Sequence, residues 1–285
     1  MATAAVSLPG KRRGRHSPLP GLPLTLGITV AWLSILLLLP LVALFAKSLT
    51  LGPGHFFEAA FSRRAIASYE LSFGAALVAA GVNAVFGLLV AWVLVRYRFP
   101  GRRLLGALVD LPFALPTAVA GIALTAVYAD TGWVGKPVAA FGIKLAYNPI
   151  GVVIALTFIG LPFVVRTVEP VLADMGRGLE EAAATLGARR WTIFRRVILP
   201  EIFPAIVTGF ALAFARGVGE YGSVIFIAGN MPFKSEIAPL LIVTKLEEYD
   251  YAGATAIATV LLLASLVLLL LINLWQGREL KRRSA

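Results

Sequence analysis

The chain contains 285 residues, of which 59% are apolar and only 14% are charged, and its mean hydropathy is +0.85. Soluble domains carry about 25% charged residues, so this composition cannot cover a globular surface with polar groups and indicates a chain that faces lipid. Lysine and arginine number 26 against 15 acidic residues, which gives a net charge of +11. An excess of positive charge is typical of proteins that bind nucleic acid and also of the cytoplasmic loops of membrane proteins. The positions of the charges decide between these two explanations.

Several classes of site are excluded by residues that the sequence lacks. There is no cysteine, which excludes disulfides, thiol nucleophiles and thiolate metal sites. The two histidines, His16 and His55, lie outside the apolar runs, so neither an HExxH zinc motif nor an intramembrane Ser–His pair can form. The phosphate-binding pattern GxxxxGK[ST] is also missing. The sequence predicts no catalytic residue, metal site or cofactor site in this chain, and any ATP must be bound by another chain.

Six apolar runs are each long enough, at about 20 residues, to cross a bilayer as a helix. Lipid offers no partners for exposed backbone groups, so these runs predict an all-α, polytopic membrane protein with six transmembrane helices. The first run is longer than the apolar part of a signal peptide and is not followed by a clear A-x-A site, so we expect it to be retained. The runs cover residues 24–46, 71–95, 104–128, 150–168, 203–228 and 252–275.

The basic residues predict the orientation of these helices. Eighteen of them fall in the two tails and in the segments after the second and fourth runs, whereas seven fall in the loops on the opposite side. The positive-inside rule places the first group, and both termini, in the cytoplasm. We therefore expect a disordered basic tail at residues 1–23 that lies against anionic lipid, a membrane domain at 24–275, and a second basic tail at 276–285. This distribution gives no support to nucleic-acid binding.

The cytoplasmic segment 169–200 is too polar to enter lipid and has a helical pattern. Leu179, Ala182, Ala183 and Leu186 form one apolar face, and Gly187 predicts a break between two short helices. Two interpretations follow from this pattern: an amphipathic helix on the lipid surface, or a docking element for a soluble partner.

The order of residues in this segment favours docking. Glu181-Ala182-Ala183 is followed after three residues by Gly187 and, nine residues later, by a segment that ends in Leu199-Pro200. This order resembles the EAA loop of permease subunits of binding-protein-dependent ABC importers, except that Val197 replaces an isoleucine. The resemblance implies the type I ABC importer permease fold and a short helix that docks on a separate ATPase subunit. It also implies that Glu181, Ala182, Ala183, Gly187, Leu199 and Pro200 serve in coupling.

The fifth apolar run carries a charged pair and a series of small residues. Gly209, Ala213 and Gly217 recur every four positions and predict a close helix contact. Arg216 lies near the middle of the run, where a charge costs about 2.5–3.5 kcal/mol, and Glu220 follows one turn later. Two roles are open for Arg216: an ion pair with Glu220, or a fixed cation that faces a passing anion.

The same region strengthens the resemblance. Residues 216–223 and 227–230 look like the sulfate/thiosulfate and molybdate permeases, and residues 235–251 look most like the T subunit of sulfate/thiosulfate importers. The resemblance implies a path for an oxyanion, and Arg216, Glu220, Ser223 and Thr117 are the candidates to line it. Thr117 follows Pro116, where the third run is expected to kink, while we expect Asp110 to pair with Arg102 or Arg103.

The partners implied by the resemblance are a sister permease of the W type, two ATPase subunits that bind ATP and Mg²⁺, and a periplasmic or lipid-anchored sulfate/thiosulfate-binding protein. The implied location is the bacterial cytoplasmic membrane. Molybdate or tungstate remains an alternative cargo, and two identical permeases an alternative to a sister pair. An ion-coupled secondary carrier is a more remote alternative, since few acidic residues lie in the runs and no internal repeat is evident. A membrane-embedded hydrolase is disfavoured because Ser223 has no base.

Overall fold

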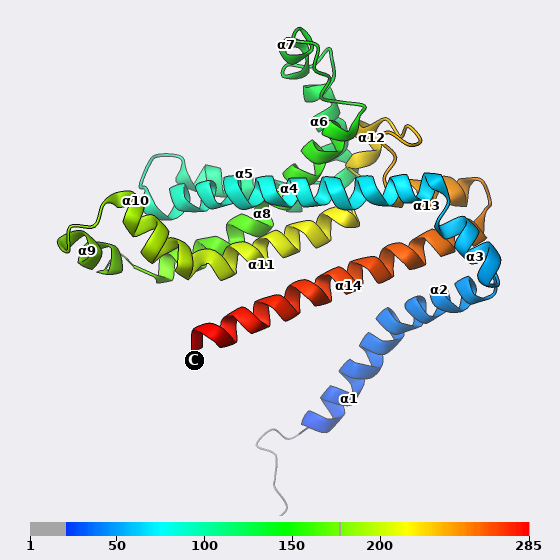
Figure 1. The fold of residues 1–285 in the computed structure, drawn as a ribbon, viewed down its shortest axis with the longest axis horizontal. Helices are drawn as coiled ribbons and strands as arrows, with labels where there is room; N and C mark the ends of the chain where they lie inside the picture. The colour runs from blue at the N-terminus through cyan, green and yellow to red at the C-terminus, as the bar shows by residue number, and fades with distance from the viewer. Residues whose placement is uncertain (1–20, 177, 285) are drawn as a thin grey trace, which may run out of the picture. The chain divides into compact units, whose positions relative to one another are not determined.

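The computed structural model describes residues 21–176 and 178–284, and every regular element in these two ranges is a helix (Figure 1). The predicted tail at residues 1–23 therefore lies almost entirely outside the described residues. The chain divides into two compact units, residues 1–46 and residues 47–285.

The first unit consists of helix α1 (Leu22–Leu33), a π-helical turn η1 (Ser34–Leu38) and most of α2 (Leu39–Leu49). These elements form one continuous apolar helix over Leu24–Leu49, which is long enough to cross a membrane. Pro40 follows the π turn by two residues and has no N–H to donate to the carbonyl four residues earlier. This missing donor accounts for the wider turn at that point, and the helix continues past it.

The second unit is built around three long helices. They are α4 (Arg63–Arg96), α8 (Pro149–Asp174) and α11 (Leu199–Val218), whose facing side chains form the main buried core. Small residues allow them to approach closely: a Cβ at Gly209 would lie 2.7 Å from Val164 Cα, and one at Gly217 would lie 3.3 Å from Ala76 Cβ. The close contact predicted from the repeat of Gly209, Ala213 and Gly217 is thus present.

One more long helix of the second unit lies beside this core. Helix α14 (Tyr251–Ser284) packs against α11, and its first part also contacts α3 (Pro53–Ala60) and α13 (Ala238–Glu247). Within residues 21–176 and 178–284, five helices are long and apolar enough to span a membrane. A sixth span is reached if the bent pair formed by α5 and α6 counts as one, so the predicted polytopic all-α class is confirmed.

The third apolar run, expected over 104–128, is bent at the kink predicted next to Pro116, and the bend is sharp enough to divide it into two helices. It forms α5 (Arg102–Ala114) and α6 (Thr117–Tyr128), whose axes differ by 115°. Leu115 precedes Pro116 and adopts an extended conformation, with φ −84° and ψ 136°. The ring of a proline disfavours helical dihedrals in the residue before it, so the helix ends here and restarts at Thr117.

The fifth apolar run also differs from its expected limits of 203–228. The helix begins earlier, through α10 (Arg190–Ile193) and a π-helical turn η2 (Phe194–Ile198), and α11 ends at Val218. A separate short helix, α12 (Val224–Ala228), follows the break. Arg216 therefore lies in the last turn of a helix, and its expected place in the middle of one span is wrong.

Four of the short helices lie at the two ends of the second unit. Helix α9 (Gly178–Thr185) and α10 lie at one end, where α4 finishes and α5 begins, whereas α3 and α13 lie at the other (Figure 1). Two other short helices lie near α6: α7 (Gly135–Ala139), which follows it, and α12, which packs against it. Because α4 runs from one end to the other, it connects the two groups.

Candidate functional site

The EAA segment, which we define as residues 178–200, folds as two short helices around a glycine turn. Glu181, Ala182 and Ala183 lie on α9, and Gly187 adopts a left-handed conformation with φ +79°. Its N–H donates to the Ala184 carbonyl at 2.9 Å, and the next N–H donates to the Ala183 carbonyl at 3.1 Å. A left-handed residue after the last helical turn is a common helix end that favours glycine. The break predicted at Gly187 is therefore present.

The apolar face of α9 lies open on the surface of the second unit. Leu179 is 57% exposed and Leu186 is 88% exposed, while Glu181 and Ala182 are also exposed and Ala183 is half-buried. Exposed leucines next to small residues are typical of a surface that another molecule covers. The geometry is thus suited to docking.

An ion pair ties α9 to the end of α4. Arg96, the last residue of α4, pairs with Glu180 and donates from Nη1 to the carbonyl of Gly176 at 3.1 Å. Its guanidinium also lies 5.6 Å from the centre of the Trp92 ring. The Arg96 side chain is only 9% exposed, so solvent screens this contact weakly. Movement of α9 is therefore linked to α4.

The second half of the EAA segment leads directly into the core. Ile193 and Ile198 are buried in the main cluster, and Leu199 and Pro200 begin α11. Pro200 follows η2 by two residues, as Pro40 follows the π turn of the first unit, and the missing N–H again accompanies a widened turn. The EAA segment is thereby continuous with α11.

The two helix breaks of the second unit meet each other. A Cβ at Gly121, on α6, would lie 2.5 Å from the carbonyl oxygen of Ser223, and one at Gly222 would overlap Oγ1 of Thr117. Glycine is needed at both positions because any side chain would push the breaks apart. The sequence candidates Thr117 and Ser223 are brought together here, although they are 106 positions apart.

Glu220 organises the break after α11. Its side chain is 2% exposed and forms an ion pair with Arg216, while its other carboxylate oxygen accepts hydrogen bonds from Ser223 N at 3.0 Å and Ser223 Oγ at 3.1 Å. The Arg216 side chain remains 37% exposed. Arg216 therefore pairs with Glu220 and still presents part of its guanidinium outside the pair. Ser223 is fully buried, and Thr117 is half-buried.

Asp110 has a different partner from those expected. Arg166, on α8, donates from Nε to Asp110 Oδ1 at 2.8 Å and from Nη2 to the Gly106 carbonyl at 3.0 Å. Arg166 also pairs with Glu169 on its own helix. The expected pairing of Asp110 with Arg102 or Arg103 is wrong, because the Asp110 side chain of α5 points toward α8.

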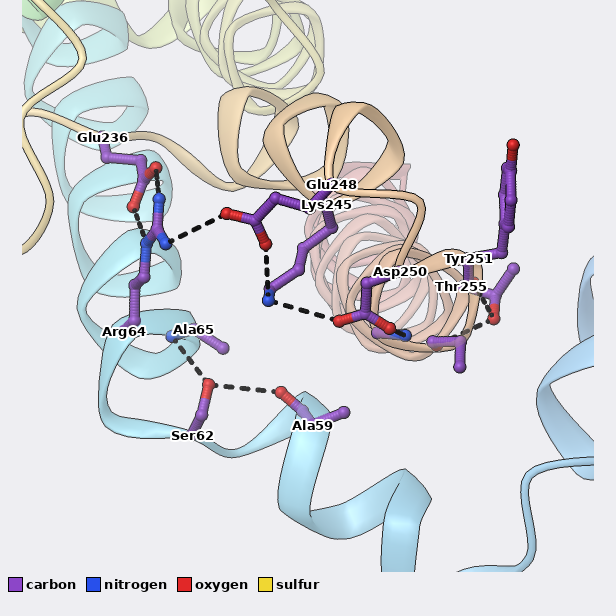
Figure 2. A network of polar contacts seen from close by, with 12 residues as sticks. Ala59, Ser62, Arg64, Ala65, Glu236, Lys245, Glu248, Asp250, Tyr251 and Thr255 are labelled. Carbon is purple, nitrogen blue, oxygen red and sulfur yellow. Dashed lines mark hydrogen bonds and ion pairs between the residues drawn. The ribbon is translucent and has the colours of Figure 1, made fainter.

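A polar network at the other end of the second unit was not predicted from the sequence (Figure 2). Arg64, at the start of α4, donates from Nε and Nη2 to both carboxylate oxygens of buried Glu236, at 2.8 and 2.7 Å. Lys245 Nζ lies 2.9 Å from Glu248 Oε2 and 3.2 Å from Asp250 Oδ2. These contacts tie the α13 region to α4. In the sequence, only the acidic and basic residues of 235–251 could have indicated that such a network forms.

Hydrogen bonds in and beside this network shift the pKa values of Lys245 and Asp250. The side-chain hydrogen bond to Glu248 is the main cause that raises the pKa of Lys245, and burial opposes it. The hydrogen bond from the Gly253 backbone N–H, at 2.8 Å, is the main cause that lowers the pKa of Asp250, and the Lys245 ammonium adds to this. Both shifts favour the charged forms, so the network is formed at neutral pH.

No group of three or more histidine and acidic side chains is placed to hold a metal ion within residues 21–176 and 178–284. The arrangement contains an exposed docking helix, a link from that helix to the core, and two facing helix breaks with a buried ion pair.

Comparison with known proteins gives consistent matches over most of the chain. Residues 83–283 match the family model described as "Binding-protein-dependent transport system inner membrane component". The chain is 50% identical over 260 residues to the sulfate transport system permease protein CysT of Escherichia coli (strain K12), covering 91% of this chain and 94% of the relative. The CysT protein of Synechococcus elongatus is 52% identical over 249 residues, covering 87% and 90%.

Solved structures with a similar fold are more distant in sequence. A bacterial ABC transporter involved in the import of the acidic polysaccharide alginate contains a chain with a TM-score of 0.70 at 20% identity, covering 90% of this chain and 95% of that one. The MetNI methionine ABC transporter contains a chain with a TM-score of 0.53 at 21% identity, covering 78% and 99%. These likenesses confirm the predicted permease fold of type I ABC importers.

Proposed function

The chain belongs to the family of binding-protein-dependent transport system inner membrane components, and from this premise we propose that it is a membrane subunit of an ATP-driven importer for sulfate or thiosulfate. The cargo is inferred from about 50% identity, over roughly nine-tenths of the chain, to several proteins named sulfate transport permease CysT. The chain is a multi-pass membrane protein, and the proposed location is the bacterial cytoplasmic membrane with both termini in the cytoplasm.

In this proposal, energy enters the chain through α9. Two separate ATPase subunits bind ATP and Mg²⁺, and closure of their dimer moves α9. The exposed face with Leu179 and Ala182 supports docking there, with the Glu181 carboxylate to fix its angle. The Arg96–Glu180 pair and the continuity of the EAA segment with α11 then carry the movement to the helices that pack in the core. This chain itself breaks no covalent bond.

The proposed path lies between this chain and a sister permease of the W type, where a periplasmic or lipid-anchored binding protein delivers the anion. The meeting point of the two helix breaks is the candidate lining. Arg216 offers a cation whose charge Glu220 partly balances, and such balance suits transient contact with a dianion, since tight binding midway would stall release. Thr117 offers a half-buried hydroxyl next to Gly222, and Ser223 supports the break through Glu220.

Uptake by the assembled transporter in proteoliposomes tests this function. Labelled sulfate is supplied with the binding protein, ATP is enclosed with the ATPase subunits, and unlabelled thiosulfate, molybdate or tungstate is added as a competitor. We expect uptake that requires ATP and is suppressed by thiosulfate but not by equimolar molybdate or tungstate. The Gly187→Pro variant should insert normally and lose uptake, because proline cannot adopt φ +79°.

Three results would contradict the proposal. Uptake driven by an ion gradient without ATP would favour a secondary carrier, and stronger suppression by molybdate or tungstate than by thiosulfate would favour the alternative cargo. Normal uptake by Gly187→Pro would exclude the turn after α9 from coupling.

A further inference from the structure

A groove runs along the last turns of α4 and past the EAA segment. We define the interfacial groove as three adjoining hollows, of which the central one shares Arg96 with one neighbour and Trp92 with the other. The central hollow has a volume of about 630 Å³ and is lined by Trp92, Tyr97, Glu180, Arg190 and Phe194, among others. The groove lies where α4, which is long and apolar enough to span a membrane, ends at Arg96, and arginines and aromatic residues at the end of such a span are typical of the membrane surface.

One side of the interfacial groove is apolar. A hollow of about 190 Å³ is lined by Leu88, Leu89, Trp92, Trp191 and Phe194. The Trp191 and Phe194 rings stack at 5.5 Å, and the Trp92 and Phe194 rings meet edge to face at 5.8 Å. Trp191 is nevertheless 69% exposed. Tryptophan rings with this exposure are enriched where acyl chains meet headgroups.

The other side is cationic. A hollow of about 760 Å³ is lined by Val95, Arg96, Tyr97, Arg98 and Arg102. Arg98 and Arg102 are exposed, as is Arg190 on the wall of the central hollow. The carboxylate of Glu180 is paired with Arg96, so of the two acidic residues in the groove only Glu181 opposes the three exposed guanidinium groups.

From this order we propose that the interfacial groove binds an anionic phospholipid, whose phosphate lies among Arg98, Arg102 and Arg190 and whose acyl chain lies along Trp92 and Trp191. The apolar and cationic sides are joined through Trp92 and Tyr97, in the order in which a lipid presents tail and headgroup. A guanidinium binds a phosphate through several parallel hydrogen bonds, and two or three of them on one headgroup give selectivity over a zwitterionic lipid. Because Glu180 and Ala184 of α9 form part of the wall, the bound lipid would contact the docking helix directly.

The test measures lipid retention by native mass spectrometry of the purified full complex with phosphatidylglycerol or phosphatidylcholine of the same acyl chains. The test variant is Arg102→Gln with Arg190→Gln. The control variant is Arg103→Gln with Arg189→Gln, which changes the neighbouring exposed arginines that do not line the groove. We expect the wild type and the control to retain phosphatidylglycerol preferentially, and the test variant to bind it roughly tenfold more weakly.

A second substitution tests the apolar side. Trp191→Ser should lower retention of both lipids, because it removes the ring stacked on Phe194 and leaves the guanidinium groups in place. Equal retention of the two lipids by the wild type would overturn the proposal. Equal losses in the test and control variants would show a diffuse charge effect and also overturn it. Retention by the permease subunits that disappears on adding the ATPase subunits would show that the groove is a protein-docking surface instead.

Discussion

Gly121 and Gly222 set the distance at which the two broken helices of the second unit meet. The closest atom to a Cβ at Gly121 is a backbone oxygen, at 2.5 Å, and backbone in a packed break cannot move aside as a long side chain does. We expect Gly121→Ala to destabilise the folded protein by ~1–3 kcal/mol through overpacking and to lower sulfate uptake with it. Thermal unfolding in detergent, followed by uptake in proteoliposomes, measures both effects.

Gly81→Ala is the matched control for this substitution. Gly81 also lies inside a helix, α4, but a Cβ there would have no atom within 4 Å. Alanine is favoured over glycine in helix interiors by up to ~1 kcal/mol, so this variant should be as stable as the wild type or more stable. If both variants lost stability equally, the cause would be general to helix glycines and not the contact with Ser223.

Arg216 shows what residue patterns alone leave open. Its spacing of four residues from Glu220 correctly suggested an ion pair, although Glu220 lies beyond the end of α11 and the pair is not made along a helix face. The second function of Glu220, as acceptor for Ser223 N and Oγ, depends on the chain leaving the helix at Gly219. Hydropathy does not reveal that break, since Val218 and the residues of α12 are as apolar as the helix before them.

At the scale of elements, the ion pair between α4 and α9 links docking to the core. We expect Glu180→Gln to reduce sulfate uptake by about three- to tenfold, because Arg96, whose side chain is only 9% exposed, would lose its ion pair with the docking helix. The amount of protein in the membrane should not change, since α9 itself is exposed. Uptake per transporter, together with ATP hydrolysis, separates loss of coupling from loss of assembly.

Two further variants define this prediction. Asp174→Asn removes an exposed carboxylate at the end of α8 and should leave uptake unchanged. Exchange of the charges, Arg96→Glu with Glu180→Arg, should recover part of the uptake that Glu180→Arg alone loses. Failure of the exchange to recover any uptake, with the protein inserted normally, would count against a coupling role for the pair.

The elements predicted from the sequence are those whose signal is local. Long apolar runs predicted the five unbroken spans, although the fifth covers Arg190–Val218 and not 203–228, and the glycine after α9 predicted its turn. Lipid exposure and a left-handed residue each depend on a few neighbours in the sequence. The 115° angle between α5 and α6 has a local cause in Pro116, but the close approach of Gly121 to Ser223 joins segments about 100 residues apart and has no local signal. Likewise, the partner of Asp110 depends on how α5 lies on α8, which no spacing within α5 encodes.

At the scale of the whole molecule, the charge excess has a structural counterpart in the second unit. The arginines that follow the second apolar run and those of the EAA segment lie at the same end, because α4 and α8 both finish there (Figure 1). The paired charges of the Arg64 and Lys245 network lie at the opposite end. These arginines thus lie at the end of the second unit that the positive-inside rule places in the cytoplasm.

This orientation predicts which end of the second unit reagents reach from outside the cell. The protein contains no cysteine, so one introduced cysteine is the only thiol that a maleimide can label. Phe141 is 83% exposed after α7, and Leu186 is 88% exposed beside the turn that follows α9. We expect a membrane-impermeant maleimide to label Phe141→Cys in intact spheroplasts, and to label Leu186→Cys only after the membrane is broken. The wild-type chain is the control and should remain unlabelled. Labelling of Leu186→Cys in intact spheroplasts would place the docking helix outside, where no ATPase subunit could reach it, and would contradict both the orientation and the coupling role of α9.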